Sequence, residues 1–252
     1  MNRTETLPDL LRRREGEVEI ISLNRPGRKN AMSMAMVNSL IDVLSAIEDD
    51  RDVRAVVLAG EGTGFCAGSD LGGLANMDAF GRRTFEAASG RVARMISQSS
   101  KPVLAAVHGF AIGGGLTLAT ACDIVLSDLP AKWSLPEVPV GLFPAWGLGS
   151  VVRRAGVTSA RRLSWGIDTL DGRGAQASGL ADEVVEGNVL AIACERARAL
   201  AALPYAQAQA VKHYFAAYCA DEAADIVANR LFIEMTGSPE AGATFRRFGP
   251  KP

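Results

Sequence analysis

The sequence lacks long runs of like charge, and its charges are nearly balanced. It has 27 Lys and Arg residues against 28 Asp and Glu residues. This balance provides no basic patch for nucleic acid and no cationic face for a membrane surface, so a small-molecule substrate is the better expectation. Residues 1–16 are polar and charged, without the apolar core of a secretory signal. We therefore expect a cytoplasmic protein.

Cysteine is scarce and scattered. The four cysteines form no Cys-x-x-Cys pair and no Cys/His cluster. This spacing is typical of neither a zinc site nor a disulfide framework, so we expect reduced, mostly buried thiols and no metal. The four residues are Cys66, Cys122, Cys194 and Cys219.

Signatures of nucleotide loops and of activated nucleophiles are also missing. The glycine-rich residues 60–64 lack a Gly-Lys-Ser/Thr ending and the GxGxxG spacing, which argues against a dinucleotide oxidoreductase. Cys66 and Ser69 have no base nearby in the sequence, and Ser69 lies in no GxSxG frame. Nucleophilic catalysis is therefore not expected.

Strand-like and helix-like segments alternate up to about residue 187, and only helix-like segments follow. This order predicts an α/β core over residues 1–187 and an α-helical region over residues 188–252. The apolar faces of the last helices need a partner, so we expect oligomerisation. Strands are expected over residues 17–23, 53–59, 103–107, 123–127, 131–135 and 181–185. Helices are expected around residues 36–47, 76–100, 116–121, 148–155, 159–166 with Thr158 as cap, 189–203, 205–219 and 221–235, and from Pro239 with Ser238 as cap.

Residues 103–128 form the apolar centre of the chain, with no charged residue between Lys101 and Asp123. Three glycines, two threonines and a histidine in this window favour a buried soluble core over a membrane span. The glycines at positions 113–115 precede a helix-like run, whose first N–H groups can hold an anion or a developing oxyanion. Alternatively, the glycines only let a helix pack closely on a sheet.

Glu137 is the one carboxylate in a stiff loop, residues 136–144, that contains three prolines. An acid among apolar neighbours is either a solvated turn residue or a desolvated base with a raised pKa. The loop alone does not decide between these interpretations.

Six short motifs stand in one order along nearly the whole chain. They are LNRP at residues 23–26, NAM at 30–32, FCAGSDL at 65–71, HGFAIGGG at 108–115, LPE at 135–137 and DGRGAQASGLADEVV at 171–185.

With these motifs the chain resembles the crotonase superfamily, the enoyl-CoA hydratase/isomerase family. The resemblance implies an α/β fold, a crotonase-like spiral of ββα units with an α-helical C-terminal trimerisation extension. It also implies an acyl-CoA thioester as substrate, coenzyme A as part of that substrate rather than a separate cofactor, and a homotrimer or hexamer.

By motif position, the resemblance assigns the two oxyanion N–H donors to Ser69 and Gly114 and the acid/base to Glu137. Hydratases of the family use a second glutamate, and its position here holds Thr117. Threonine can orient a water but does not ionise near neutral pH, so Thr117 either holds that water or is structural. A single carboxylate suffices for Δ3–Δ2 isomerisation, so hydration and isomerisation of an enoyl-CoA both stay open.

The resemblance places coenzyme A along the loop after the first strand and the segment of the FCAG motif. Candidates in the loop are Arg28 and Lys29 for the adenine and phosphate end and Ala31 for a backbone contact. The candidates in the second segment are Ala67, Asp70 and Leu71, followed by glycines where the family often has a basic residue. A decarboxylase or thioesterase on the same scaffold, or a non-catalytic acyl-CoA-binding member, are the alternative functions.

Overall fold

A computed structural model describes residues 3–219 and 222–249, so the expected helix start at residue 221 and the last three residues lie outside the description. The strands are β1 (Arg3–Leu7), β2 (Leu10–Glu15), β3 (Val18–Leu23), β4 (Ala55–Gly60), β5 (Val103–Val107), β6 (Phe110–Ile112), β7 (Ile124–Asp128), β8 (Lys132–Ser134) and β9 (Glu183–Val185). The α-helices are α1 (Met34–Asp49), α2 (Leu71–Ala75), α3 (Ala79–Gln98), α4 (Gly114–Thr120), α5 (Leu148–Ser164), α6 (Gly172–Ala177), α7 (Val189–Ala201), α8 (Tyr205–Ala216), α9 (Glu222–Met235) and α10 (Pro239–Phe248). Two 3₁₀ turns, η1 (Pro26–Arg28) and η2 (Val138–Val140), complete the described elements.

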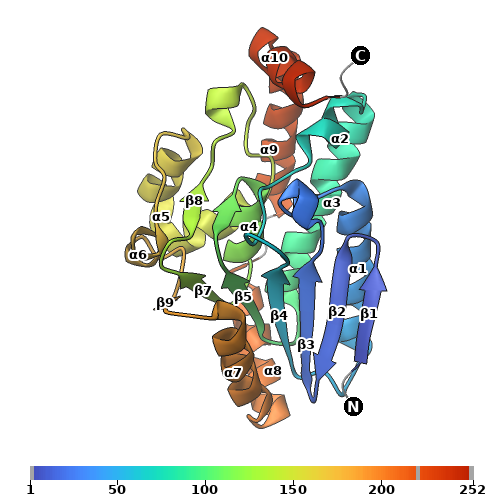
Figure 1. Ribbon diagram of the computed structural model, residues 1–252, viewed down its shortest axis with the longest axis vertical. Coiled ribbons are helices and arrows are strands. Elements are labelled where there is room, and N and C mark those ends of the chain that lie inside the picture. Colours follow the sequence, from blue (N-terminus) through green and yellow to red (C-terminus); the bar gives the residue numbers. More distant parts are fainter. Residues whose placement is uncertain (1–2, 220–221, 250–252) are drawn as a thin grey trace.

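A seven-stranded sheet in the order β1-β2-β3-β4-β5-β7-β9 forms the base of the molecule (Figure 1). The first three strands pair antiparallel, and every pair from β3 to β9 is parallel. Parallel pairs need crossover connections, and helices supply them here. The expected alternation of strands and helices is therefore confirmed as a mixed α/β fold.

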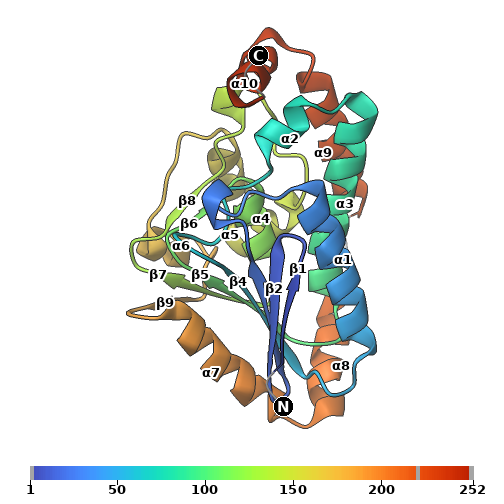
Figure 2. The ribbon, with the colours of Figure 1, turned by 45° about the vertical axis from the view of Figure 1, so that its right-hand side comes forward.

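Helices cover both faces of this sheet. Strand β3 is buried along its whole length, and its alternate residues enter two separate apolar clusters. Ile21 and Leu23 join the cluster that holds the apolar side chains of α1, α3 and α4, whereas Val18 and Ile20 join the cluster of α7. Figure 2 shows α7 on the opposite side of the sheet from α1 and α3. The period of two thus separates the faces, as the pleat of a strand requires.

Helix α7 belongs by its contacts to the sheet of its own chain. Small buried residues, Ala193, Ala197 and Ala201, let it approach β4 and β5 closely. The expected division into an α/β core and a helical region at residue 187 stays a prediction, and so does oligomerisation. Helix α8, which follows α7, carries the exposed side chains of Val211 and Tyr214.

Among the strands and α-helices, β1, β2, β6 and α2 were not expected from the sequence. Strands β1 and β2 were not expected, because polar and charged residues dominate both segments and leave no alternating apolar pattern. The two helices expected over residues 148–155 and 159–166 are confirmed as the two segments of α5, which are separated by non-helical backbone at Gly156 with φ +74° and ψ 160°. Thr158, however, lies within the second segment and is not its cap.

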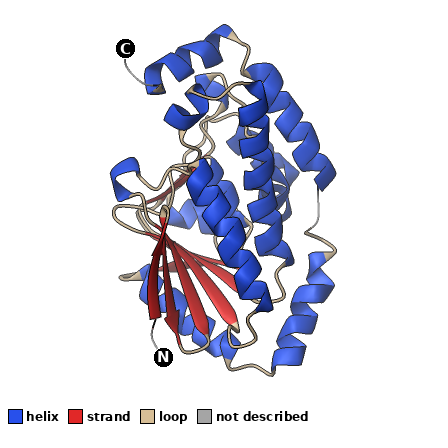
Figure 3. Cartoon of the chain, turned by 90° about the vertical axis from the view of Figure 1, so that its right-hand side faces the viewer, coloured by secondary structure: helices blue, strands red, loops and turns tan. Residues whose placement is uncertain are grey.

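A second, two-stranded sheet of β6 and β8 positions the turn into α4. Helices extend beyond the end of the main sheet, as Figure 3 shows, and the candidate site lies among them. Within the described residues, no helix is both long enough and apolar enough to cross a membrane. The four cysteines are free, and Cys219 alone among them is not buried.

Candidate active site

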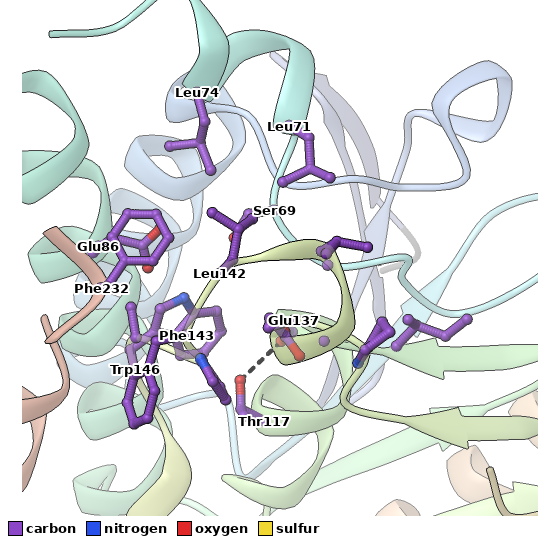
Figure 4. A pocket seen from close by; sticks show the side chains of 18 of the residues that line it. Ser69, Leu71, Leu74, Glu86, Thr117, Glu137, Leu142, Phe143, Trp146 and Phe232 are labelled. Carbon is purple, nitrogen blue, oxygen red and sulfur yellow. Dashed lines mark hydrogen bonds between the residues drawn. The ribbon is translucent and has the colours of Figure 1, made fainter. Parts of the chain in front are cut away.

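One pocket brings together three segments that are far apart in the sequence, and two helices close it (Figure 4). The loop after β4 contributes Ser69, the turn into α4 contributes Gly114 and Thr117, and the proline-rich loop contributes Glu137. Most of the remaining lining is apolar. Helices α3 and α9 close the pocket, and its other lining residues include Leu71, Leu74, Glu86, Leu142, Phe143, Trp146 and Phe232.

The N–H groups of Ser69 and Gly114 lie on two loops that touch. A Cβ atom added to Gly68, which has φ +93°, would lie 3.2 Å from the Gly114 nitrogen. Among the described residues, neither the Ser69 nor the Gly114 N–H donates a hydrogen bond within the protein. Two unused donors therefore stand near each other at one wall of the pocket.

The three consecutive glycines each meet a close neighbour. Gly113 has φ +56°, and a Cβ atom there would lie 2.6 Å from Oε1 of Glu137. A Cβ atom on Gly115 would lie 2.3 Å from the carbonyl oxygen of Cys66. Gly115 is therefore needed for close packing of the helix against the backbone of Cys66, which was the alternative explanation of the glycines. Gly113 leaves room for the carboxyl group of Glu137.

Glu137 begins the η2 turn, and its backbone is fixed there. Its carbonyl oxygen accepts hydrogen bonds from Val140 N at 3.1 Å and Leu142 N at 2.9 Å. The residue is half-buried, yet its Oε2 atom is buried without a hydrogen-bond partner in the described structure. Burial raises the pKa of Glu137 to about 7. The carboxyl group is thus desolvated and is not a solvated turn residue, and its role as a base stays a prediction.

Thr117 lies in the first turn of α4, and its side chain is buried against the backbone of Gly147. Its hydroxyl group donates a hydrogen bond of 3.1 Å to the carbonyl oxygen of Gly114 (Figure 4). This bond is the local type that the structural interpretation of Thr117 expected. The hydroxyl oxygen can still accept a hydrogen bond from the pocket.

Glu86 of α3 is a pocket residue that the sequence analysis missed. It lies on the buried face of α3 between Phe85 and Ser89, and only 3% of it is exposed. Burial raises the pKa of Glu86 to about 8, and the negative charge of Glu137 adds to the rise. The sequence does contain a signal for Glu86, because it is a charged residue on a helix face whose other residues are apolar or small.

The candidate coenzyme A residues divide into two groups. Arg28 and Lys29 are exposed at the η1 turn and make no hydrogen bond or ion pair through their side chains with described residues. Asp70 instead has two structural roles, since it accepts a hydrogen bond from Gly73 N and pairs with Arg25 at 3.0 Å. Asp70 is therefore less free for a ligand than expected.

Backbone bonds tie the two coenzyme A segments together. Ala67 N donates to the Lys29 carbonyl at 3.0 Å, and Met32 N donates to the Gly68 carbonyl at 2.8 Å. Ala31 is half-buried between these bonds, and its own carbonyl accepts a hydrogen bond from Arg25. Ala67 and Leu71 also line the pocket.

Helix α10 holds the loop of Glu137 in place. Thr244 donates a hydrogen bond of 2.6 Å to the carbonyl oxygen of Val140. Gly141 has φ +77°, and a Cβ atom there would lie 2.6 Å from Ala241 N. The last helix, α10, thus packs on the proline-rich loop of its own chain that carries Glu137.

Trp133 lies outside the pocket lining, and the described residues contain no metal-binding group. Trp133 is fully buried and donates its indole N–H to Ser127, so it packs in the core instead of lining the pocket. Across residues 3–219 and 222–249, no group of three or more His, Cys, Asp or Glu side chains is arranged to hold a metal ion.

Comparison with known proteins assigns the family. The family model described as enoyl-CoA hydratase/isomerase matches residues 13–242. The chain is 33% identical over 186 residues to a short-chain-enoyl-CoA hydratase of Clostridium acetobutylicum, which covers 73% of this chain and 71% of the relative.

Solved structures give the same assignment. An enoyl-CoA hydratase/isomerase from Mycobacterium paratuberculosis is similar with a TM-score of 0.88 and 25% identity, covering 96% of this chain and 99% of the other. AtuE of Pseudomonas aeruginosa is similar with a TM-score of 0.79 and 35% identity, covering 93% of both chains. The chain therefore belongs to the enoyl-CoA hydratase/isomerase family and has the crotonase fold.

Proposed function

We propose that this protein adds water across the double bond of a 2-enoyl-CoA thioester. In this proposal the N–H groups of Ser69 and Gly114 donate to the thioester oxygen, and Glu137 moves the proton at the carbon next to the thioester. The observation that carries the proposal is the buried, unpartnered Oε2 of Glu137 in the same pocket as both unused N–H donors.

The chemistry needs these two kinds of group. Addition of water to an enoyl thioester passes through an enolate, which places negative charge on the thioester oxygen. Two fixed donors stabilise that charge by several kcal/mol in a site that excludes water. A carboxyl group whose pKa lies near 7 can both give and take a proton at neutral pH, as Glu137 does in this proposal.

The names of relatives support hydration over other reactions of the fold. Curated relatives at 30–35% identity include a short-chain-enoyl-CoA hydratase, a crotonyl-CoA hydratase and a 2,3-dehydroadipyl-CoA hydratase. All of these names describe addition of water to an acyl-CoA. No cofactor beyond the coenzyme A of the substrate is part of the proposal.

Δ3–Δ2 isomerisation is the second candidate, and Thr117 favours it. The second carboxylate of family hydratases is replaced by a hydroxyl group that already donates to the Gly114 carbonyl. Isomerisation needs one base, which takes a proton from one carbon and returns it two carbons away. Glu137 alone would suffice for that transfer.

Coenzyme A binding in this proposal uses the loop from Arg28 to Ala31 and the segment that contains Ala67 and Leu71. The two exposed cations, Arg28 and Lys29, face solvent where a phosphate can reach them. Ala67 lines the pocket, and its N–H donates to the Lys29 carbonyl, which ties the pocket wall to the loop that holds Ala31.

The test compares a 2-enoyl-CoA and a 3-enoyl-CoA side by side, in wild type and in Glu137→Gln. Loss of the conjugated thioester absorbance reports hydration, and its gain reports isomerisation. We expect hydration in wild type, lost by at least a hundredfold in Glu137→Gln while binding of the acyl-CoA is retained.

Turnover of only the 3-enoyl-CoA would favour the isomerase. Turnover of neither thioester, with binding retained, would move the assignment to decarboxylation, thioester hydrolysis or a binding role. Undiminished hydration in Glu137→Gln would contradict the proposed mechanism directly.

A further inference from the structure

Glu86 is the feature of the pocket that the family motifs leave unexplained. It projects from the buried face of α3 into the pocket that Glu137 also lines (Figure 4). Its carboxyl group makes no hydrogen bond or ion pair with any residue of the described chain, although only 3% of the residue is exposed. A buried acid without a partner costs stability, so the fold alone does not account for it.

The half-buried cations of α3, Arg82 and Arg94, and Lys212 of α8 have other partners, while Arg83 and Arg91 of α3 are exposed. Arg82, one turn before Glu86, donates to a backbone carbonyl and lies over an aromatic ring. Arg94 pairs with Asp225 of α9, and Lys212 of α8 pairs with the aspartate that follows α4. Helix α1 carries only acidic charges, and α4 carries none. The one charged group in the pocket with Glu86 is thus a second acid.

We propose that Glu86 is the second proton-transfer group of this site and takes the place of the carboxylate that Thr117 replaces. The inference rests on the proposed enoyl-CoA hydration and adds to it the group that handles the water. Glu137, whose Oε1 lies beside the oxyanion turn at Gly113, serves the carbon next to the thioester, C2. Glu86 serves the water that bonds to the following carbon, C3.

The proton and electron balance needs a pair of acids that holds one proton. In hydration, ionised Glu86 takes a proton from water as the water oxygen bonds to C3, and the π electrons of the C2=C3 bond move to form the enolate. Protonated Glu137 then gives its proton to C2, and the thioester carbonyl reforms. Dehydration reverses each step: Glu137 takes the C2 proton, and Glu86 protonates the leaving hydroxide.

The electrostatics of the pair fit this use. Burial raises the pKa of both carboxyl groups, to about 7 for Glu137 and about 8 for Glu86. Two acids in one apolar pocket resist ionising together, so the pair keeps a single proton close to neutral pH. Dehydration starts with Glu137 ionised and the proton on Glu86, and hydration starts with the same single proton on Glu137 instead.

The experiment compares wild type with Glu86→Gln, Glu137→Gln and a matched control, Ser89→Ala. Ser89 lies on the same buried face of α3, and its hydroxyl has no partner in the described structure. Two reactions are followed: hydration of a short 2-enoyl-CoA, and exchange of the C2 protons of a saturated acyl-CoA with D2O. The exchange needs the oxyanion donors and Glu137 but no water addition.

We expect Glu86→Gln to lose hydration by a hundredfold or more and to keep C2 exchange within about threefold. Glu137→Gln should lose both reactions, and Ser89→Ala should keep both. Binding of the acyl-CoA should be unchanged in Glu86→Gln, which shows that the pocket is intact.

Three results would overturn the inference. Hydration by Glu86→Gln within threefold of wild type, with Glu137→Gln inactive, would remove Glu86 from the reaction and leave the proposed function standing. Equal loss of hydration and exchange in Glu86→Gln would make Glu86 a structural residue. Absence of hydration in wild type would overturn the proposed function and this inference together.

A wild-type measurement keeps the inference testable if Glu86→Gln does not fold. Hydration should fall on both sides of a pH optimum, because it needs one protonated and one ionised acid. C2 exchange should rise to a plateau, because it needs only ionised Glu137. Parallel pH profiles for the two reactions would contradict the assignment of Glu86.

Discussion

The substitution Glu86→Gln should stabilise the protein, and the gain should grow with pH. In the unfolded chain a glutamate ionises near its ordinary pKa of 4.5, whereas the buried carboxyl group keeps its proton up to about 8. Between these values unfolding releases a proton, so the free energy of unfolding of wild type falls as pH rises. Below 4.5 the carboxyl group is neutral in both states, and this penalty is absent.

The size of the effect follows from the same two pKa values. One pH unit corresponds to about 1.36 kcal/mol, so the penalty is up to about 3 kcal/mol at pH 7 and up to about 5 kcal/mol at pH 9. Glutamine has nearly the same shape and never ionises, so it carries no such pH-dependent term. The variant should match wild type near pH 4.5 and exceed it at pH 9.

Urea unfolding followed by tryptophan fluorescence measures this difference. The protomer concentration is held fixed, because the stability of an oligomer depends on concentration. Ser89→Ala is the matched control, since it changes the same helix face without removing an acid. A difference between Glu86→Gln and wild type that does not grow from pH 5 to pH 9 would refute the reasoning. It would mean that Glu86 is ionised and compensated in the folded protein.

Three other substitutions test the geometry of the site and its support. Gly113→Ala should lower kcat at least tenfold, because the added Cβ atom would lie 2.6 Å from Oε1 of Glu137. It should also cost about 1–3 kcal/mol, because φ +56° with ψ −127° is a conformation that side chains rarely adopt; turnover and urea unfolding measure both effects. Thr117→Val should cost about 1–3 kcal/mol but lower hydration less than tenfold, and a hundredfold loss of rate would assign the water to Thr117 instead. Lys212→Met should lower the free energy of unfolding by about 2–3 kcal/mol with turnover unchanged, less than for a fully buried pair because Asp123 is 32% exposed.

The sequence predicted those parts of the site that lie in short motifs and depend on local backbone conformation. Ser69, Gly114 and Glu137 lie in one pocket as expected, because glycine turns and a stiff proline loop constrain the chain locally. The strands and helices of the core also followed their apolar periods, as the two faces of β3 show. The chemical roles of Ser69, Gly114 and Glu137 stay predictions until they are measured.

The part that the sequence did not predict depends on tertiary contacts. Glu86 is one acid among several charged residues of α3, and only the packing of α3 against the pocket distinguishes it. Strand β2 was missed for a related reason: its arginines pair across the sheet, as Arg12 does with Glu19 at 2.6 Å, so charge replaces the apolar pattern of a strand. Arg25 likewise gains its role from Asp70, which lies 45 residues away in sequence.

The structure of the protein with a bound enoyl-CoA analogue tests the central claim most directly. We expect the thioester oxygen about 2.7–3.1 Å from the nitrogens of both Ser69 and Gly114, with Glu137 at C2 and a water between Glu86 and C3. A thioester oxygen away from these two nitrogens would contradict the proposed function. A correctly placed thioester with Glu86 beyond reach of C3 and of any water on it would contradict only the role of Glu86.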